Sequence, residues 1–202
     1  VDTDFKMVET PAPEPGDGEL LIRTIYQSLD PYMRGRMNPG LSYTAGVSLG
    51  EVMGAGTVGQ VVASRHDRFA EGDFVLSSNG WQEYAVSDGR GVRKLDPAAA
   101  PISTAVGVLG MPGMTAYAGL LEVGELKDGD NVVVSAASGA VGAVVGQIAK
   151  IKGHRVVGVA GAQKKCDYVT GELGVDACVS HRSETLPDDL KTACPDGIDV
   201  YF

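Results

Sequence analysis

Gly139 and Gly142 stand in a short turn whose residue types suit the binding of a diphosphate. The turn follows three consecutive valines, Val132 to Val134, and precedes a segment whose apolar residues recur every three or four positions. This pattern is typical of a buried strand, a tight turn and an amphipathic helix. A diphosphate would bind against the free N–H groups and the positive end of that helix, so the turn backbone must be bare enough to approach it. The two glycines meet this requirement.

The glycine pattern is incomplete, because Ala137 stands where the dinucleotide-binding fingerprint G-x-G-x-x-G has its first glycine. A lone glycine-rich turn is a weak signal, and the alternative is a tight strand-to-helix connection that binds no ligand. The sequence around the turn is therefore needed to distinguish between these two interpretations.

Lys164 and Lys165 follow the turn at the place where an NAD-binding unit usually has Asp or Glu, about 20 residues further on, to hold the ribose hydroxyls. Replacing an acid by two lysines adds attraction for the extra phosphate of NADP, so NADP is favoured over NAD. The alternative is a solvated helix start, although cations at a helix N-terminus are slightly unfavourable. His181 could approach the same end of the cofactor or could be a loop residue.

A second candidate site lies in the segment Asp30–Met37, which combines the phenol of Tyr32 with two guanidinium groups and two methionines in a segment of turn character. Tyr43 follows a few residues later. Loops collect functional groups as well as ordinary surface chemistry, so the alternative is an arginine-bearing turn packed on its own domain.

The elements that position the glycine turn alternate between strand and helix. We predict strands over 132–134, 155–161, 177–179 and 199–202, and helices over 141–152, 163–173 and 188–194. This alternation predicts a parallel, doubly wound sheet. A complete dinucleotide fold has about six strands, so we expect the chain to be a fragment that lacks the C-terminal half of this domain.

The preceding part of the chain favours antiparallel β-structure. Strands are predicted over 20–28, 74–76 and 81–88, and the glycine-rich and valine-rich residues 46–63 suit the bent strands of a small β-barrel. The composition changes at 95–101, after which a Met-Pro-Gly turn precedes a predicted helix over 115–121. We therefore predict two domains, residues 1–102 and residues 103–202.

Composition and charge exclude several classes of function. Hydrophobic residues make up 44% and charged residues 21% of the chain, as in ordinary soluble globular proteins. A net charge of −9 and a pI near 4.7 argue against a nucleic-acid or anionic-membrane surface. No apolar run is long enough for a membrane span and nothing reads as a signal peptide, so we expect a cytoplasmic protein.

The cysteines and histidines do not form a recognisable site. No C-x-x-C pair or Cys/His cluster is present, so we predict no metal site. An odd number of cysteines suits reduced thiols better than a disulfide framework. The residues concerned are Cys166, Cys178, Cys194, His66, His154 and His181.

Four ordered motifs resemble the zinc-independent medium-chain dehydrogenases/reductases, in the group of the prostaglandin (leukotriene) reductases, alkenal double-bond reductases and curcumin reductase. The motifs are DPYMRGRM, GMPGMTAYAGLLEVG, AASGAVGAVVGQIAKIKG and GIDVYF, and the resemblance covers nearly all 202 residues. It implies an α/β protein in which a GroES-like β-barrel catalytic domain precedes a Rossmann-type parallel sheet domain, here truncated. It also implies NADPH-dependent reduction of the carbon–carbon double bond of α,β-unsaturated aldehydes or ketones.

The resemblance implies roles for individual residues. Lys165 matches the lysine at the NADP phosphate, and His181 stands where relatives usually have a tyrosine that touches the ribose phosphate. Tyr32 and Tyr43 match tyrosines of the substrate pocket. The other residues that it assigns to the cofactor are Met111, Pro112 and Thr115 near the nicotinamide, Gly139, Ala140, Val141 and Gly142 at the diphosphate, and Gly161.

Zinc alcohol dehydrogenases share the implied architecture but need thiol and imidazole ligands. Ser28, Leu29 and Asp30, and the segment Gly50-Glu51-Val52, occupy the regions where those ligands would be expected. The resemblance therefore implies catalysis without a metal. It also implies a homodimer for the full-length protein, with a small-molecule enone or alkenal as substrate.

Conjugate reduction builds charge on the carbonyl oxygen of the substrate, and a hydrogen-bond donor must meet that oxygen. We expect Tyr32 to be this donor and Tyr43 to shape the pocket, although Tyr32 could instead be an aromatic residue packed between domains. Three other functions stay open. They are an NADPH quinone reductase, a non-catalytic module that senses NADPH, and an inactive fragment.

Overall fold

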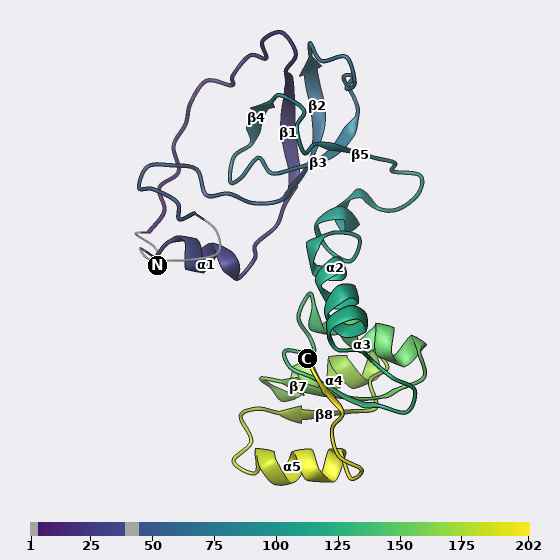
Figure 1. The fold of residues 1–202 in the computed structure, drawn as a ribbon. Coiled ribbons are helices and arrows are strands. Elements are labelled where there is room, and N and C mark those ends of the chain that lie inside the picture. The colour runs from purple at the N-terminus through teal and green to yellow at the C-terminus, as the bar shows by residue number, and fades with distance from the viewer. Residues whose placement is uncertain (1–3, 39–44) are drawn as a thin grey trace. The chain divides into compact units, whose positions relative to one another are not determined.

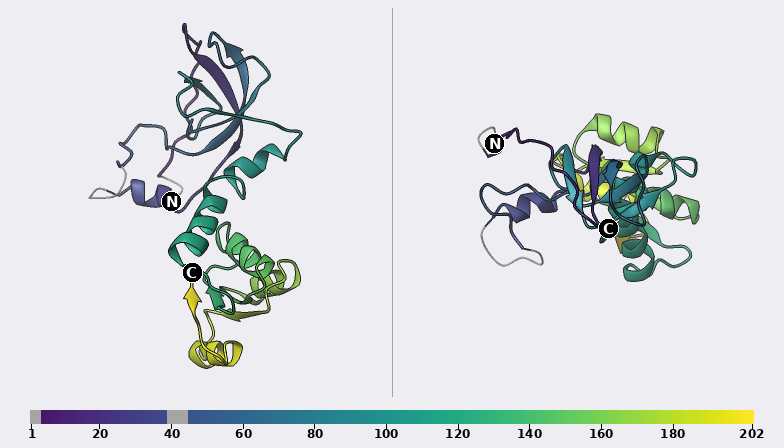
Figure 2. Two further views of the ribbon diagram at one scale, coloured as in Figure 1. Left: turned by 45° about the vertical axis from the view of Figure 1, so that its right-hand side comes forward. Right: turned by 90° about the horizontal axis from the view of Figure 1, so that it is seen from above.

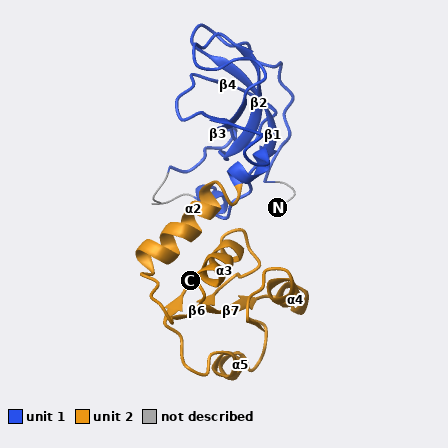
Figure 3. Ribbon diagram, turned by 90° about the vertical axis from the view of Figure 1, so that its right-hand side faces the viewer, with its two compact units in different colours: residues 1–106 blue, residues 107–202 orange. Residues whose placement is uncertain are grey.

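The computed structural model describes residues 4–38 and 45–202, which fall into two compact units, Val1–Val106 and Gly107–Phe202 (Figure 3). The division lies at the end of η1 (Ile102–Val106), a 3-10 helix whose Ala105 is buried. The boundary predicted from the sequence, after residue 102, lies inside this helix. The helix packs against β2 (Thr57–Ser64) of the first unit, a contact that the local sequence does not reveal.

The first unit is built on a five-stranded antiparallel sheet (Figure 1). Its strands lie in the order β4-β1-β2-β3-β5, and its core contains Leu20, Ile22, Val61, Phe69 and Val75. The register between β1 and β2 shifts at two points, and such irregularities bend a strand pair. The remaining strands are β1 (Leu20–Gln27), β3 (Phe74–Ser77), β4 (Tyr84–Ser87) and β5 (Arg93–Leu95).

The segment that the sequence indicated as a turn contains a short helix, α1 (Tyr32–Arg36). Pro31 precedes it with φ of −55°, which is compatible with the first turn of a helix. Met33 is buried against Met53 and Ala55, and Tyr32 packs against the same cluster. The expectation of turn structure was therefore wrong, because burial of one methionine favours a helical turn that local residue preferences did not predict.

The second unit is built on a four-stranded parallel sheet in the order β8-β7-β6-β9. The strands are β6 (Asn131–Val134), β7 (Arg155–Ala160), β8 (Ala177–Ser180) and β9 (Val200–Tyr201). Helices α3 (Gly142–Ile151) and α4 (Gln163–Gly171) lie on one face of the sheet, and α5 (Leu186–Ala193) lies on the other, as Figure 1 and the left view of Figure 2 show. The predicted fold class, an antiparallel β domain followed by a parallel α/β domain, is confirmed.

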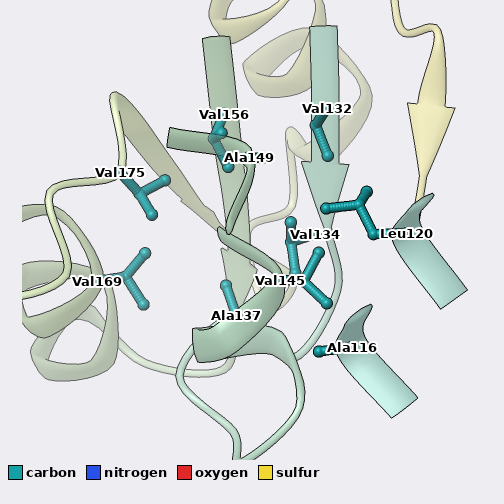
Figure 4. Packing of buried hydrophobic residues seen from close by; sticks show 10 residues of the cluster. All are labelled: Ala116, Leu120, Val132, Val134, Ala137, Val145, Ala149, Val156, Val169 and Val175. Carbon is teal, nitrogen blue, oxygen red and sulfur yellow. The ribbon is translucent and has the colours of Figure 1, made fainter. Parts of the chain in front are cut away.

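The valine run of β6 is buried on both faces of this sheet. Val132 and Val134 pack with residues of α2, α3 and α4, whereas Val133 packs with Val157, Val159 and residues of α5 on the other face. Figure 4 shows the first of these two clusters, in which Ala137 of the glycine turn is also buried. Side chains alternate between the faces of a strand, and parallel strands are covered on both, so a continuous apolar run is stable here.

The Met-Pro-Gly sequence is the first turn of α2 (Met111–Ala118) rather than a turn before it. Pro112 lies in that first turn, where a missing N–H costs nothing. A Cβ on Gly113 would lie 1.7 Å from the carbonyl oxygen of Val108, so only glycine fits there. The helix continues as a π-helical turn, η2 (Gly119–Val123).

The expectation of three free thiols was wrong for two of them. Cys166 of α4 and Cys178 of β8 form a disulfide with a Cα–Cα distance of 5.2 Å, and Cys194 is free and buried. The first turn of α4 packs across β7 and β8, so two cysteines separated by 12 residues meet.

In the described parts of the chain, the helices are too short or too polar to cross a bilayer.

Candidate functional site

The glycine turn joins β6 to α3 in a geometry that only small residues permit. Ala136 has a left-handed backbone with φ of 46°, and Ala137 N–H donates to the carbonyl oxygen of Val159 in β7 at 3.1 Å. A Cβ on Gly142 would lie 2.5 Å from the carbonyl oxygen of Ala136. The turn is thus tied to the neighbouring strand, and the start of α3 lies directly against its backbone.

Backbone donors are free at the start of α3. Val141 precedes the helix and has no side chain that could cap it, and the first turn carries no acidic residue. In residues 4–38 and 45–202, no acceptor receives the N–H groups of Ala140, Val141 or Gly142. Free N–H groups and the positive end of a helix together favour an anion. Ala140, Val141 and Gly142 can therefore serve that purpose, whereas the N–H of Gly139 already donates to the carbonyl oxygen of Ala136 at 2.7 Å.

Gly161 follows the carboxyl end of β7, and His181 and Arg182 follow the carboxyl end of β8. A Cβ on Gly161, just after β7, would lie 2.9 Å from Cε1 of His181 and 3.8 Å from Nε of Arg182. His181 N–H donates to the carbonyl oxygen of Ala160 at 2.9 Å, so the two strand ends are joined. The structure therefore brings Gly161 and His181 together, and their role toward the cofactor stays a prediction.

Lys165 lies in the first turn of α4, four residues beyond Gly161 in the chain, and its backbone N–H donates to the carbonyl oxygen of Ala162 at 2.9 Å. Lys164 and Lys165 are both exposed, and within the described residues neither forms an ion pair. Within the described residues, the two ammonium groups are therefore free of ion pairs, and the role of Lys165 at the cofactor phosphate stays a prediction.

The residues predicted near the nicotinamide lie on α2. Met111 and Thr115 are both exposed and four positions apart, so they share one face of the helix, whereas Pro112 is buried. Helix α2 packs against α3, which carries the glycine turn at its start. Their role toward the cofactor stays a prediction.

The predicted substrate residues belong to the first unit. Tyr32 is partly buried beside Met33 and Met53, and Tyr43 lies outside the described residues. Tyr32 and the glycine turn lie in different units, so the expectation that they meet at one substrate also stays a prediction.

The regions where zinc ligands would be expected carry side chains that are held by local hydrogen bonds. The Ser28 hydroxyl donates to the carboxylate of Asp30, and the Glu51 carboxylate accepts the N–H of Ser48 at 2.9 Å. Zinc sites also accept carboxylate ligands, but they usually include thiolate or imidazole, and none of these residues supplies either. Across residues 4–38 and 45–202, no group of three or more His, Cys, Asp or Glu side chains is arranged to hold a metal ion.

One structural carboxylate was missed by the sequence analysis. Asp176 accepts a hydrogen bond from Lys150 Nζ at 2.7 Å and another from the N–H of Val156 at 2.7 Å. Burial favours a higher pKa for Asp176, but the hydrogen bonds from Lys150 and Val156 outweigh it, so the pKa lies below its usual value. Only a Gly-Val-Asp sequence before the predicted third strand hinted at this residue.

Two protein-family models match most of the chain. A model described as the N-terminal domain of oxidoreductase matches residues 1–95, and a model described as zinc-binding dehydrogenase matches residues 140–202. The NADPH-dependent curcumin reductase of Escherichia coli (strain K12) is 50% identical over 202 residues, which cover 100% of this chain and 59% of that protein. Prostaglandin reductase 1 of Oryctolagus cuniculus is 43% identical over 205 residues, covering 100% and 56% respectively.

A solved structure is also similar. CurA from Vibrio vulnificus in complex with NADPH superposes with a TM-score of 0.96 at 48% identity, and the match covers 100% of this chain and 60% of that one. The chain thus spans 56–60% of the length of these three relatives.

Proposed function

Because this chain belongs to the medium-chain dehydrogenase/reductase family, in the group of the curcumin and prostaglandin reductases, we propose that it serves NADPH-dependent reduction of α,β-unsaturated aldehydes and ketones. The observation that carries the proposal is the edge of the parallel sheet. There, the free N–H groups at the start of α3 follow the carboxyl end of β6. Lys165 and His181 follow the carboxyl ends of the parallel strands β7 and β8, at the same edge of the sheet. This arrangement suits a dinucleotide that carries one additional phosphate.

Within this proposal, the N–H groups of Ala140, Val141 and Gly142 bind the diphosphate. Lys165 and His181 bind the adenosine phosphate, whose charge is about −1.5 to −2 at neutral pH. Gly161 leaves room for that phosphate because it has no side chain. Met111 and Thr115, on one face of α2, border the nicotinamide, and buried Pro112 fixes the start of that helix.

The bound cofactor supplies a hydride to the substrate. Tyr32 donates a hydrogen bond to the carbonyl oxygen, on which negative charge develops, and Tyr43 shapes the pocket. Stabilising that charge is commonly the largest catalytic contribution. Zinc takes no part in this scheme, because the regions around Ser28, Asp30 and Glu51 supply neither a thiolate nor an imidazole. The substrates are small molecules; a homodimer and a cytoplasmic location stay predictions.

The proposal is tested by titrating the chain with NADPH and with NADH while nicotinamide fluorescence is recorded. We expect saturable binding of NADPH and clearly weaker binding of NADH, since only NADPH carries the additional phosphate. Absence of NADPH binding, or equal affinity for both, would contradict the assignment of the cofactor.

The reaction is tested in the longest native polypeptide that contains this chain. With NADPH as reductant, enones should be turned over faster than quinones. Replacing Tyr32 by Phe should lower enone turnover by about 100-fold, the usual effect of removing one oxyanion donor, with little change in NADPH affinity. Unchanged turnover would remove Tyr32 from the mechanism, and binding without turnover of either substrate class would favour a sensor.

A further inference from the structure

Two cysteines adjoin the candidate cofactor site without having a part in it. Cys166 directly follows Lys165 in the first turn of α4, and Cys178 lies on β8, three residues before His181. The two form a disulfide with a Cα–Cα distance of 5.2 Å, which is within the range that a disulfide spans without backbone movement. The bond thus joins the two elements that carry the proposed ligands of the adenosine phosphate.

The disulfide lies in the layer between the sheet and α4. A Cβ on Gly158 would lie 2.9 Å from Cβ of Ala137, 2.8 Å from Cγ1 of Val169 and 3.6 Å from Sγ of Cys178. Cys178 therefore lies above the same strand position as Ala137 of the glycine turn.

The two sulfur atoms differ in access. Cys166 is 4% exposed, whereas Cys178 is partly exposed on β8, which is the edge strand of the sheet. Cys178 is therefore the more accessible of the two cysteines. This is the arrangement of an accessible attacking thiol and a protected resolving thiol.

The third cysteine is a natural control. Cys194 packs on the opposite face of the sheet with Val133, Val157 and Val159. Burial raises the pKa of the Cys194 thiol, although nearby Arg155 opposes this, so little thiolate is present near neutral pH. Cys194 has no cysteine partner among the described residues and should not respond to mild oxidants.

We propose that Cys166 and Cys178 are a reversible redox modification site, oxidised by a low-molecular-weight disulfide such as oxidised glutathione. The Cys178 thiolate attacks one sulfur of that disulfide and releases one small thiol. The Cys166 thiolate then attacks Sγ of Cys178 and releases the second. The two protein thiols lose two electrons and two protons in total, and the small disulfide is reduced to two thiols, so the exchange balances.

The bond has two consequences. It closes the segment between α4 and β8, which restricts the unfolded chain and stabilises the folded one. It also fixes the turn that carries Lys165 relative to the strand that leads to His181. If the proposed function is correct, this preorganisation tightens NADPH binding, because less conformational freedom is lost when the phosphate binds.

The test compares the chain after full reduction with the same chain after treatment with oxidised glutathione. Free thiols should fall from three to one, the intact mass should drop by two hydrogens, and peptide mapping should identify the Cys166–Cys178 link. The midpoint of thermal unfolding should rise by about 5–10 °C on oxidation. C166S and C178S should lose this rise, whereas C194S should keep it.

Three outcomes distinguish the redox pair, its effect on NADPH binding and the proposed function. Retention of three thiols, or a glutathione adduct on Cys178 without the internal bond, overturns the inference whether or not NADPH binds. An internal bond that leaves the NADPH dissociation constant unchanged overturns its regulatory part, since oxidation should lower that constant several-fold in the parent and not in C178S. A redox-dependent unfolding midpoint without NADPH binding in either state supports the redox pair and contradicts the proposed function.

Discussion

Gly142 allows the backbone of the glycine turn to lie against the start of α3. The atoms that a side chain would meet at this position, the carbonyl group of Ala136 and Cα of Ala137, belong to the backbone and cannot rotate away. Ala136 already has a left-handed conformation, so the turn has little freedom to adjust. The residues predicted to bind the diphosphate are therefore held in place by steric contacts as well as by hydrogen bonds.

Gly142→Ala should destabilise the chain by about 1–3 kcal/mol, the usual cost of overpacking, and should weaken NADPH binding. The matched control is Gly171→Ala at the end of α4, where an added Cβ meets nothing within 4 Å and which should be tolerated. Thermal unfolding and NADPH titration measure the two effects. Normal stability and affinity in Gly142→Ala would show that the turn can open, which contradicts the steric argument.

Lys165→Glu should weaken NADPH binding by about 10- to 100-fold, because a charge-assisted hydrogen bond contributes about 1.5–3 kcal/mol. The affinity for NADH, which lacks the phosphate, should fall much less. The control is Lys152→Gln, at the C-terminal end of α3 and away from the glycine turn. It should leave the affinities for NADPH and NADH unchanged. Equal losses for NADPH and NADH would mean that Lys165 acts on the fold rather than on the phosphate.

The carboxylate of Asp176 joins the C-terminal end of helix α3 to the sheet. Asp176 connects Lys150 of α3 with the N–H of Val156 at the start of β7, and its side chain is 29% exposed. The glycine turn lies at the other end of the same helix. The position of α3 therefore depends on apolar packing along its length and on this ion pair at its end.

The depressed pKa of Asp176 predicts the sign of an acid effect. A carboxylate whose pKa is lower in the folded state than the unfolded value near 3.8 stabilises the fold above that value, and this stabilisation is lost as the pH falls through the folded-state pKa. The free energy of unfolding should therefore decrease as the pH falls below that unfolded-state value and through the lower folded-state pKa. Asp176→Asn should remove this component.

Urea unfolding of the parent and of Asp176→Asn at pH 7 and at progressively lower pH provides the measurement. At pH 7 the variant should be less stable by about 1–3 kcal/mol, the usual contribution of hydrogen bonds to a charged group. The difference should shrink as the parent carboxylate is protonated. A constant difference at every pH would show that the carboxylate charge is not responsible.

In the chain as a whole, every residue proposed to bind the cofactor lies in Gly107–Phe202, and both proposed substrate tyrosines lie in Val1–Val106. Each unit has its own buried apolar cluster. The proposed cofactor residues and the proposed substrate residues thus lie in separately packed parts of the chain.

Residues 107–202 expressed alone should therefore bind NADPH with nearly the affinity of the whole chain. Circular dichroism establishes whether the isolated unit is folded, and NADPH fluorescence gives the affinity. A folded unit that does not bind would show that residues of the first unit contribute to the cofactor site.

Much of the second unit could be predicted because its signals are local. The valine run of β6, the apolar spacing of α3 and the glycines that follow each helix all lie within short windows of sequence. The elements predicted less well are α1 and the start of α2. Tyr32–Arg36 is helical because Met33 is buried by Met53, and Met111–Gly113 is helical because proline is compatible with a first turn.

The amino-acid order was enough to establish the strand–turn–helix unit, the succession of parallel strands and the presence of lysines where an NAD-binding protein has an acid. Hydrophobic periodicity and backbone preference act between near neighbours, so a linear sequence carries them. The tertiary structure was needed to pair Cys166 with Cys178, to place His181 against Gly161 and to join Asp176 to Lys150. These contacts depend on which strands are adjacent and on which helix covers them, and those relations arise only when the whole sheet packs.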